Sequence, residues 1–93
     1  MLKLNPLLHQ ELRLSIMSFL VNIDWADFKK LMEVTAASKG NLSVQLSKLQ
    51  KAGYIEVKKS FKGNYPHTEC KITAKGKKEF DSYLKDLKSL LNL

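Results

Sequence analysis

Several residue types are scarce in this chain, and each shortage excludes a class of protein. The 93 residues include one cysteine and two histidines, so no disulfide can form within the chain and no four-ligand metal site can be built from these residues. No run approaches about 18 apolar residues, which excludes a membrane-spanning helix. Polar residues between His9 and Arg13 interrupt the apolar start and exclude a secretory signal. We therefore expect a cytoplasmic protein without a metal or other cofactor.

Groups of residues that carry out catalysis are missing as well. The sequence has no nucleophile–base–acid set, no phosphate-binding glycine loop and no paired carboxylates, so we expect no enzyme. Cys70 falls in an alternating apolar pattern and is predicted to be a small core residue, with a redox switch as the alternative. His9 is predicted to be a capping or interface group rather than a base.

Positive charge is present in excess and is unevenly distributed. The net charge is +7, while residues 38–78 alone hold ten lysines against two glutamates, a net charge of +8. Residues 1–37 are neutral and residues 79–93 carry −1. Such segregation indicates an anionic partner, most often nucleic acid; the alternative is a lysine-rich face that contacts only water.

The first half of the chain predicts three helices. Asn5-Pro6 is a helix start, and the predicted helix continues to Val21 with apolar residues on two stripes. Asp24 is placed to cap a second helix ending near Val34, with a very short strand possible at Ile23. Ser38 is placed to cap a third helix over residues 39–52, which buries a leucine stripe and ends at Gly53.

After Gly53 the apolar period changes from helical to alternating. Residues 54–72 predict a β-hairpin with its turn at Gly63-Asn64, and Pro66 is expected to block continuation of a ladder. Thr73 is placed to cap a last helix over residues 74–91. This order predicts one mainly α domain with a small β-hairpin over residues 1–93. The predicted fold is a winged helix-turn-helix, with the helix-turn-helix at about 26–52, a wing at about 54–72 and an added C-terminal dimerisation helix at about 74–91.

Particular motifs also resemble a known family. Residues 39–55 contain K-G-N-L-S and L-x-K-A-G-Y-I elements, and residues 8–17 and 72–76 extend the likeness over nearly the whole chain. The sequence resembles small stand-alone winged-helix transcriptional regulators of bacteria and archaea, of the MarR-like and ArsR-like kind. The resemblance implies a sequence-specific regulator that binds double-stranded DNA, with its recognition helix in the major groove. Metal sensing of the ArsR-like kind is not expected, because its ligands are missing.

The face of the third helix opposite its leucines is the predicted reading surface. Asn41 is suited to pair with an adenine edge, Val44 to contact a thymine methyl group, and the serines and lysines to contact bases or phosphates. The alternative is that this polar face simply contacts water. The predicted DNA-binding residues of the recognition helix are Lys39, Gly40, Asn41, Ser43, Val44, Ser47 and Lys48.

The wing is expected to lie along the DNA backbone or in the adjacent minor groove. It lacks the arginines common at the wing tips of this family, which favours phosphate contact over minor-groove insertion. Tyr65 is suited either to stack or to cover the hairpin. The predicted DNA-binding residues of the wing are Lys58, Lys59, Lys62, Asn64, Tyr65 and His67.

The resemblance also implies a homodimer that pairs through its terminal helices. Two recognition helices would then meet half-sites about 34 Å apart on a near-palindromic operator. The alternatives are a monomer whose last helix covers the first, and a winged-helix protein-interaction or RNA-associated module. The predicted dimer-interface residues are Leu7, Leu14, Met17, Phe80, Leu84, Leu87 and Leu91.

Overall fold

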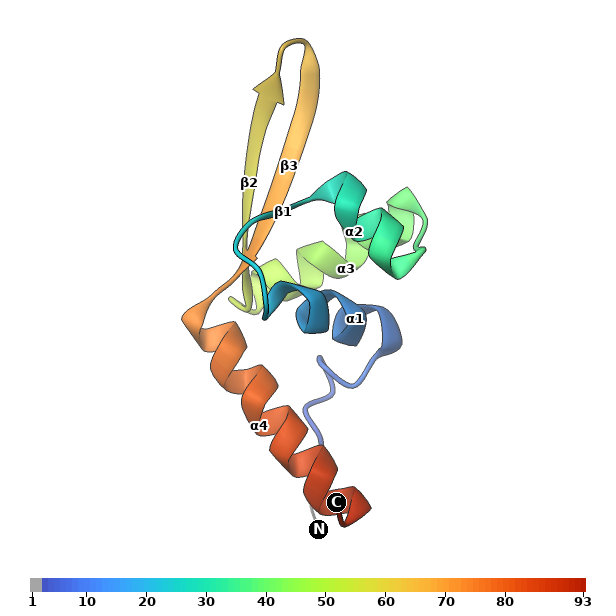
Figure 1. Ribbon diagram of the computed structural model, residues 1–93, viewed down its shortest axis with the longest axis vertical. Helices are drawn as coiled ribbons and strands as arrows, with labels where there is room; N and C mark the ends of the chain where they lie inside the picture. The colour runs from blue at the N-terminus through green and yellow to red at the C-terminus, as the bar shows by residue number, and fades with distance from the viewer. Residues whose placement is uncertain (1–2) are drawn as a thin grey trace.

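Four helices and a three-stranded antiparallel sheet make up the computed structural model, which describes residues 3–93 (Figure 1). The strands lie in the order β1-β3-β2, and the β2–β3 hairpin projects from one end of the molecule while α4 projects from the other. The predicted winged helix-turn-helix is therefore confirmed, with one more strand than the predicted hairpin. In chain order the elements are α1 (Glu11–Leu20), β1 (Ala26–Asp27), α2 (Phe28–Thr35), α3 (Lys39–Lys51), β2 (Ile55–Lys62), β3 (Tyr65–Ile72) and α4 (Ala74–Leu91).

The hydrophobic core lies where α1, α2 and α3 meet the base of the sheet. Each helix contributes one buried stripe, and the hairpin contributes the alternate residues nearest its base. Fully buried side chains from these elements include Ile16, Met17, Leu20, Leu31, Leu42, Leu49 and Cys70.

The first helix starts later than predicted. Asn5 caps only a single turn, in which its Oδ1 accepts hydrogen bonds from the backbone N–H groups of Leu7 and Leu8 at 2.9 and 3.4 Å. Gln10 then takes an extended conformation and caps α1, its side chain accepting from the Arg13 backbone N–H at 2.8 Å. The predicted continuous helix from Asn5 was wrong because two caps compete over these residues.

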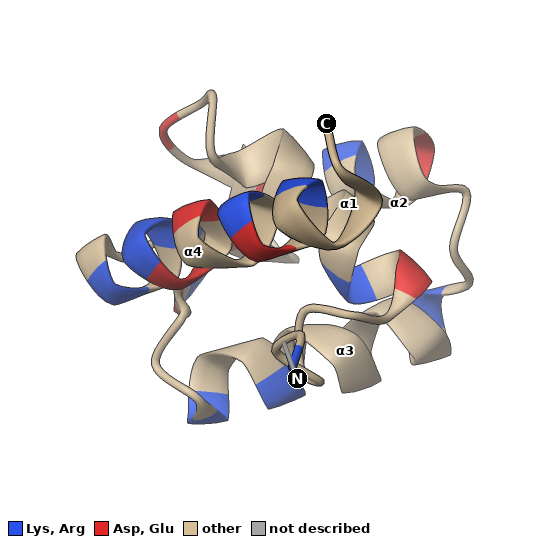
Figure 2. Cartoon of the chain, turned by 90° about the horizontal axis from the view of Figure 1, so that it is seen from below, with Lys and Arg blue, Asp and Glu red and all other residues tan. Residues whose placement is uncertain are grey.

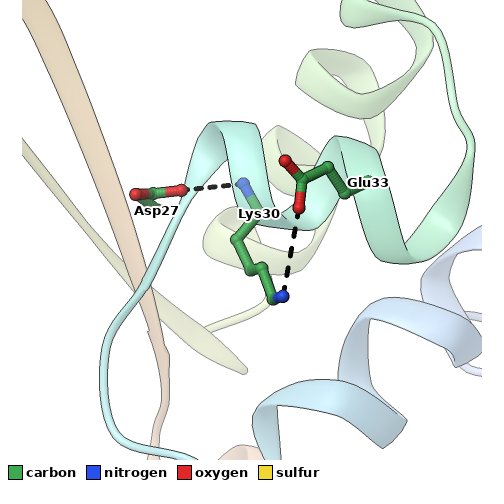
Figure 3. Close-up of polar contacts among 3 residues, drawn as sticks. All are labelled: Asp27, Lys30 and Glu33. Carbon is green, nitrogen blue, oxygen red and sulfur yellow. Dashed lines mark hydrogen bonds and ion pairs between the residues drawn. The ribbon is translucent and has the colours of Figure 1, made fainter.

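The second helix also starts later than expected, because a strand takes its first residues. Ala26 pairs with Cys70 and Asp27 with Glu69, so residues 26 and 27 form β1, three residues after the predicted Ile23. Asp27 rather than Asp24 caps α2, accepting from the Lys30 backbone N–H at 2.7 Å, and the Lys30 ammonium lies 3.9 Å from Glu33 (Figure 3).

The hairpin follows the prediction except at one residue. The turn falls at Gly63-Asn64, as expected, and Gly63 has a positive φ of 62°. Pro66 does not end the ladder: it lies within β3, opposite Phe61. This is possible because β1 reaches only Glu69 and Cys70, so Pro66 has a pairing strand on one side alone and its missing N–H is not needed on the other.

The start of α4 packs tightly against Gly53 and Tyr54, in the turn between α3 and β2. Thr73 donates from its backbone N–H to the Tyr54 carbonyl at 3.0 Å and from its hydroxyl to the Gly53 carbonyl at 2.7 Å. The same hydroxyl caps α4 by accepting from the Gly76 N–H at 2.9 Å. Gly76 is buried, and a Cβ there would overlap the Tyr54 carbonyl oxygen. Only glycine therefore fits at this crossing.

Two of the predicted dimer-interface residues belong to the core of the chain itself. Met17 is fully buried and Phe80 is 5% exposed, so neither side chain is available to a partner. Both predictions were wrong because these side chains pack into the hydrophobic core of the chain itself. The N-terminal segment is also held by hydrogen bonds to Tyr54 and to α4. Asn5 donates to the Tyr54 hydroxyl at 2.9 Å, and His9 Nδ1 lies 2.8 Å from the Tyr83 hydroxyl.

Replacing Gly76 by alanine should destabilise the protein by about 1–3 kcal/mol, because the added methyl group displaces α4 from the Tyr54 backbone. Gly40, in the first turn of α3, serves as the control, since a methyl group added there would meet nothing within 4 Å. Gly40→Ala should be neutral or stabilising by up to about 1 kcal/mol. Urea unfolding measures both, and equal effects of the two substitutions would contradict the packing described.

Burial raises the pKa of the Cys70 thiol from 9.0 to about 11. The folded protein therefore keeps a proton that the unfolded chain releases above pH 9, so this contribution to stability is intact below pH 9 and is lost as the pH rises toward 11. We expect the stability difference between wild type and Cys70→Ala to shrink over that range in urea titrations. A stability difference between the two proteins that stays constant from pH 9 to pH 11 would contradict this expectation.

Candidate nucleic-acid interface

Helix α3 presents two chemically different faces. Its buried face consists of Leu42, Gln45, Leu46 and Leu49. All seven residues predicted to read DNA lie on the remaining surface and are exposed, including Val44, whose side chain is 50% exposed. The Ser38 hydroxyl caps the helix by accepting from the Asn41 backbone N–H at 3.2 Å, which fixes where this surface begins.

A series of hydrogen bonds behind this surface connects α1 to α3. Arg13 donates from Nε to the Leu7 carbonyl at 2.6 Å and from Nη1 to the side-chain oxygen of Gln45. The Gln45 amide nitrogen donates to Asn41 Oδ1 at 3.1 Å. Our reasoning from the sequence missed Arg13 and Gln45, although Gln45 follows Leu42 by three residues and so falls on the leucine face.

The two faces of the hairpin differ because side chains alternate along each strand. On one face Val57 lies opposite Cys70, Lys59 opposite Thr68, and Phe61 opposite Pro66. The buried Cys70 and the half-buried Val57 identify this as the face directed toward the helices. The other face carries the pairs Lys58–Glu69, Ser60–His67 and Lys62–Tyr65.

Between α3 and the first of these faces lies an open groove of about 450 Å³. Its walls combine two lysines with hydroxyl and amide groups, and none of its lining residues is acidic. The groove is lined by Phe28, Lys39, Ser43, Leu46, Ser47, Gln50, Val57, Lys59, Pro66 and Thr68. We refer to it as the α3–wing groove.

The predicted interface residues are only partly brought together by this groove. Lys39, Ser43 and Ser47 of α3 line it, and so does Lys59 of the wing. Gln50 and Thr68 line it as well, although they were not predicted. Thr68 could have been placed on this face by extending the Ile55, Val57 alternation across the hairpin.

Four predicted wing residues lie on the face of the hairpin directed away from the groove: Lys58 and His67 in its middle, and Lys62 and Tyr65 at its tip. The Lys58 ammonium lies 5.2 Å from the centre of the Trp25 ring, and His67 Nε2 lies 3.6 Å from the Glu69 carboxylate. Lys71 adds a second cation 5.8 Å from the Trp25 ring centre and an ion pair of 3.3 Å with Asp24. Lys58 and His67 therefore have partners within the chain and do not line the groove.

The hairpin tip carries the remaining predicted wing residues. Lys62, Asn64 and Tyr65 are all exposed there, and Tyr65 is 78% exposed, so it does not cover the hairpin. Phe61, which was not predicted, is 73% exposed on the groove-directed face.

Helix α4 differs from α3 in charge. Figure 2 shows lysine and acidic residues alternating along α4, whereas α3 contains lysines and no acidic residue. The far end of α4 instead exposes leucines: Leu84, Leu90 and Leu91 are 40–55% exposed. Leu7, Leu14 and Leu87 are half-buried beside the core.

Within residues 3–93, no three His, Cys, Asp or Glu side chains are grouped so that they could hold a metal ion. No helix in the same part of the chain has the length and apolarity needed to cross a membrane.

Comparisons with known proteins agree with this geometry. An uncharacterized protein of Methanocaldococcus jannaschii is 33% identical over 78 residues, which cover 84% of this chain and 85% of that protein. The solved structure of a transcriptional regulator homologue from Pyrococcus horikoshii OT3 matches with a TM-score of 0.85 at 29% identity, covering 92% of this chain and 85% of that one. NadR, solved in complex with 4-hydroxyphenylacetate, matches with a TM-score of 0.71 over 94% of this chain and 64% of its own. Its identity of 21% shows the fold alone.

A family model gives the most direct assignment. The model of the winged helix DNA-binding domain matches residues 12–91, which include every helix and strand except the first residue of α1. The resemblance to small winged-helix regulators noted in the sequence is confirmed by this match and by the structure of the transcriptional regulator homologue from Pyrococcus horikoshii OT3. The chain belongs to the family of winged helix DNA-binding domains.

Proposed function

We propose that this protein is a sequence-specific transcriptional regulator that binds double-stranded DNA as a homodimer. The observation that carries the proposal is the α3–wing groove, where exposed small polar residues of α3 and lysines from two elements face one open space. This arrangement suits a binding protein rather than an enzyme.

The exposed face of α3 supports insertion of this helix into the major groove. Asn41 and the serines supply hydrogen-bonding groups, and the half-exposed Val44 supplies an apolar group that suits a thymine methyl. The exposed Gly40 has open space within 4 Å of the position that a Cβ would take, which allows a DNA backbone to approach closely. Lys39 and Lys48 are proposed to contact phosphates on either side of the major groove.

The wing supports contact with the DNA backbone next to the major groove. Lys59 faces the same space as α3, and the exposed Lys62 and Asn64 at the tip, outside the groove, are proposed to meet the backbone farther along the duplex. Lysine is a point charge without the planar fork of arginine, so we propose phosphate contact here rather than base reading. Lys58 and His67 are left out of the proposed contact set, because they face away from the groove and already contact Trp25 and Glu69.

The exposed leucines of α4 support pairing with a second copy of the chain. Leu84 and Leu91 lie two turns apart on one side of the helix, and Leu87 lies between them. We propose these residues, with Leu7 and Leu14, as the dimer interface. A two-fold dimer would place two recognition helices on half-sites about 34 Å apart, so a near-palindromic operator is expected.

The test is a fluorescence-anisotropy titration of wild type against a random duplex and a structured RNA at about 50 and 200 mM salt. Preferential duplex binding that weakens steeply with salt is expected. Equal or tighter RNA binding, or binding to neither, would contradict the proposal and favour an RNA-associated or protein-interaction module.

Neighbouring lysines provide a matched pair of variants for the same titration. Lys59→Ala should weaken binding to every duplex and reduce the salt slope by about one unit, because one phosphate contact is lost. Lys58→Ala removes the same charge from the opposite face of the hairpin and should have a clearly smaller effect. If both variants lose the same amount of affinity for duplex DNA, the α3–wing groove is not where the wing meets DNA.

Replacing both Leu84 and Leu91 by glutamate should produce a monomer in sedimentation analysis, because charges would have to be buried in the proposed interface. Affinity for a palindromic site should fall, while affinity for a single half-site is kept. Ser82 is exposed on the opposite side of α4, so Ser82→Glu serves as the control. A dimer that persists in the double variant would refute this interface.

A further inference from the structure

We infer that Arg13 and Gln45 fix the orientation of the Asn41 side-chain amide, so that Nδ2 rather than Oδ1 points toward DNA. Arg13 and Gln45 would then be positioning residues for base recognition, although Arg13 lies on another helix and Gln45 is buried. The inference rests on the proposed function, in which Asn41 reads a base.

The orientation begins at Arg13, because a guanidinium group can only donate hydrogen bonds. Its Nε is held by the Leu7 carbonyl at 2.6 Å, and its Nη1 contacts one end of the Gln45 side-chain amide. That end must be the oxygen, since an amide nitrogen facing the guanidinium would bring two donors together. The charge of Arg13 thus decides which way the Gln45 amide lies.

The orientation of the Gln45 amide in turn determines that of the Asn41 amide. With its oxygen toward Arg13, Gln45 directs Nε2 toward Asn41, where the acceptor at 3.1 Å is Oδ1. Gln45 is only 8% exposed and sits among Leu42, Leu46 and Leu49, so it has little room for other rotamers. Asn41 is exposed one turn earlier on α3, and its remaining amide group is the Nδ2 donor.

This orientation has a consequence for base recognition. An asparagine free to turn its amide can present either a donor or an acceptor at the same point. Because Oδ1 accepts from Gln45, Nδ2 is left to donate to acceptors in the major groove of DNA, such as purine N7.

Gln45→Glu tests the inference with almost no change of shape. One carboxylate oxygen would pair with Arg13 and the other would face Asn41, where two oxygens cannot share a hydrogen bond. The Asn41 amide must therefore turn so that Nδ2 donates inward and Oδ1 points outward. The major groove of the DNA would then face the Oδ1 acceptor of Asn41 at the point where wild type presents the Nδ2 donor.

The measurement compares four duplexes that differ at one base pair. Selection from a randomised library identifies the preferred site, and Asn41→Ala identifies the base pair at which wild-type discrimination disappears. At that pair, Gln45→Glu should lower the preference for the wild-type base by about fivefold or more and shift it toward bases that present an amino donor. Its added negative charge should weaken all four duplexes by a common factor, which cancels in the ratio.

The same substitution in the Asn41→Ala background is the control. There Gln45→Glu should leave the ratio among the four duplexes unchanged, because the side chain it turns is absent. A folded Gln45→Glu variant with the wild-type ratio, or one with the same change of ratio in both backgrounds, would overturn the inference. Wild type that binds duplexes without base preference would overturn the proposed function and the reading role together.

Should Gln45→Glu fail to fold, as judged by circular dichroism and thermal melting, Arg13→Met provides the second variant. It removes the donor that holds Gln45 but leaves the surface facing DNA unaltered. Discrimination at the Asn41 base pair should fall, while affinity for a random duplex stays within about twofold of wild type. An unchanged ratio in a folded Arg13→Met variant would overturn the inference.

Discussion

Three leucines of α3 hold that helix in the core, and the rest of the molecule is arranged around this contact. Leu42, Leu46 and Leu49 are at most 5% exposed, and full burial of such a side chain stabilises a fold by about 1.5–3 kcal/mol. With these residues inward, the helical period leaves the opposite face of α3 exposed to solvent. The surface that would meet DNA is therefore set by the part of the helix that never touches it.

The wing is held to α3 by a second constraint of the same kind. Ile55 and Ile72 are buried, so the alternation of the strands carries Lys59 and Thr68 onto the side facing α3 and Lys58 onto the other side. A one-residue change of register would exchange the two lysines. The positive charge of the groove thus depends on core packing at the base of the hairpin.

Much of this architecture could be predicted from the sequence, because its signals are local. Ser38, Gly53, Gly63 and Thr73 each act where their chemistry predicts, as caps or turn residues. Apart from the start of α1, where two local caps compete, the errors arise where residues distant in the sequence decide the outcome. Pairing of Ala26 with Cys70 moved the start of α2, and tertiary packing buried Met17 and Phe80 in the core. The hydrogen bonds from Arg13 through Gln45 to Asn41 join two helices, so no local sequence pattern predicts that these three residues interact.

We propose that DNA meets the exposed face of α3 together with the inner face of the wing. This proposal is tested most directly by recording amide correlation spectra of the ¹⁵N-labelled protein during titration with a duplex. We expect the largest shifts at residues 39–48, Lys59 and Thr68, with small shifts at Lys58 and along the charged side of α4. Shifts confined to α4 or to the outer face of the hairpin would contradict the account.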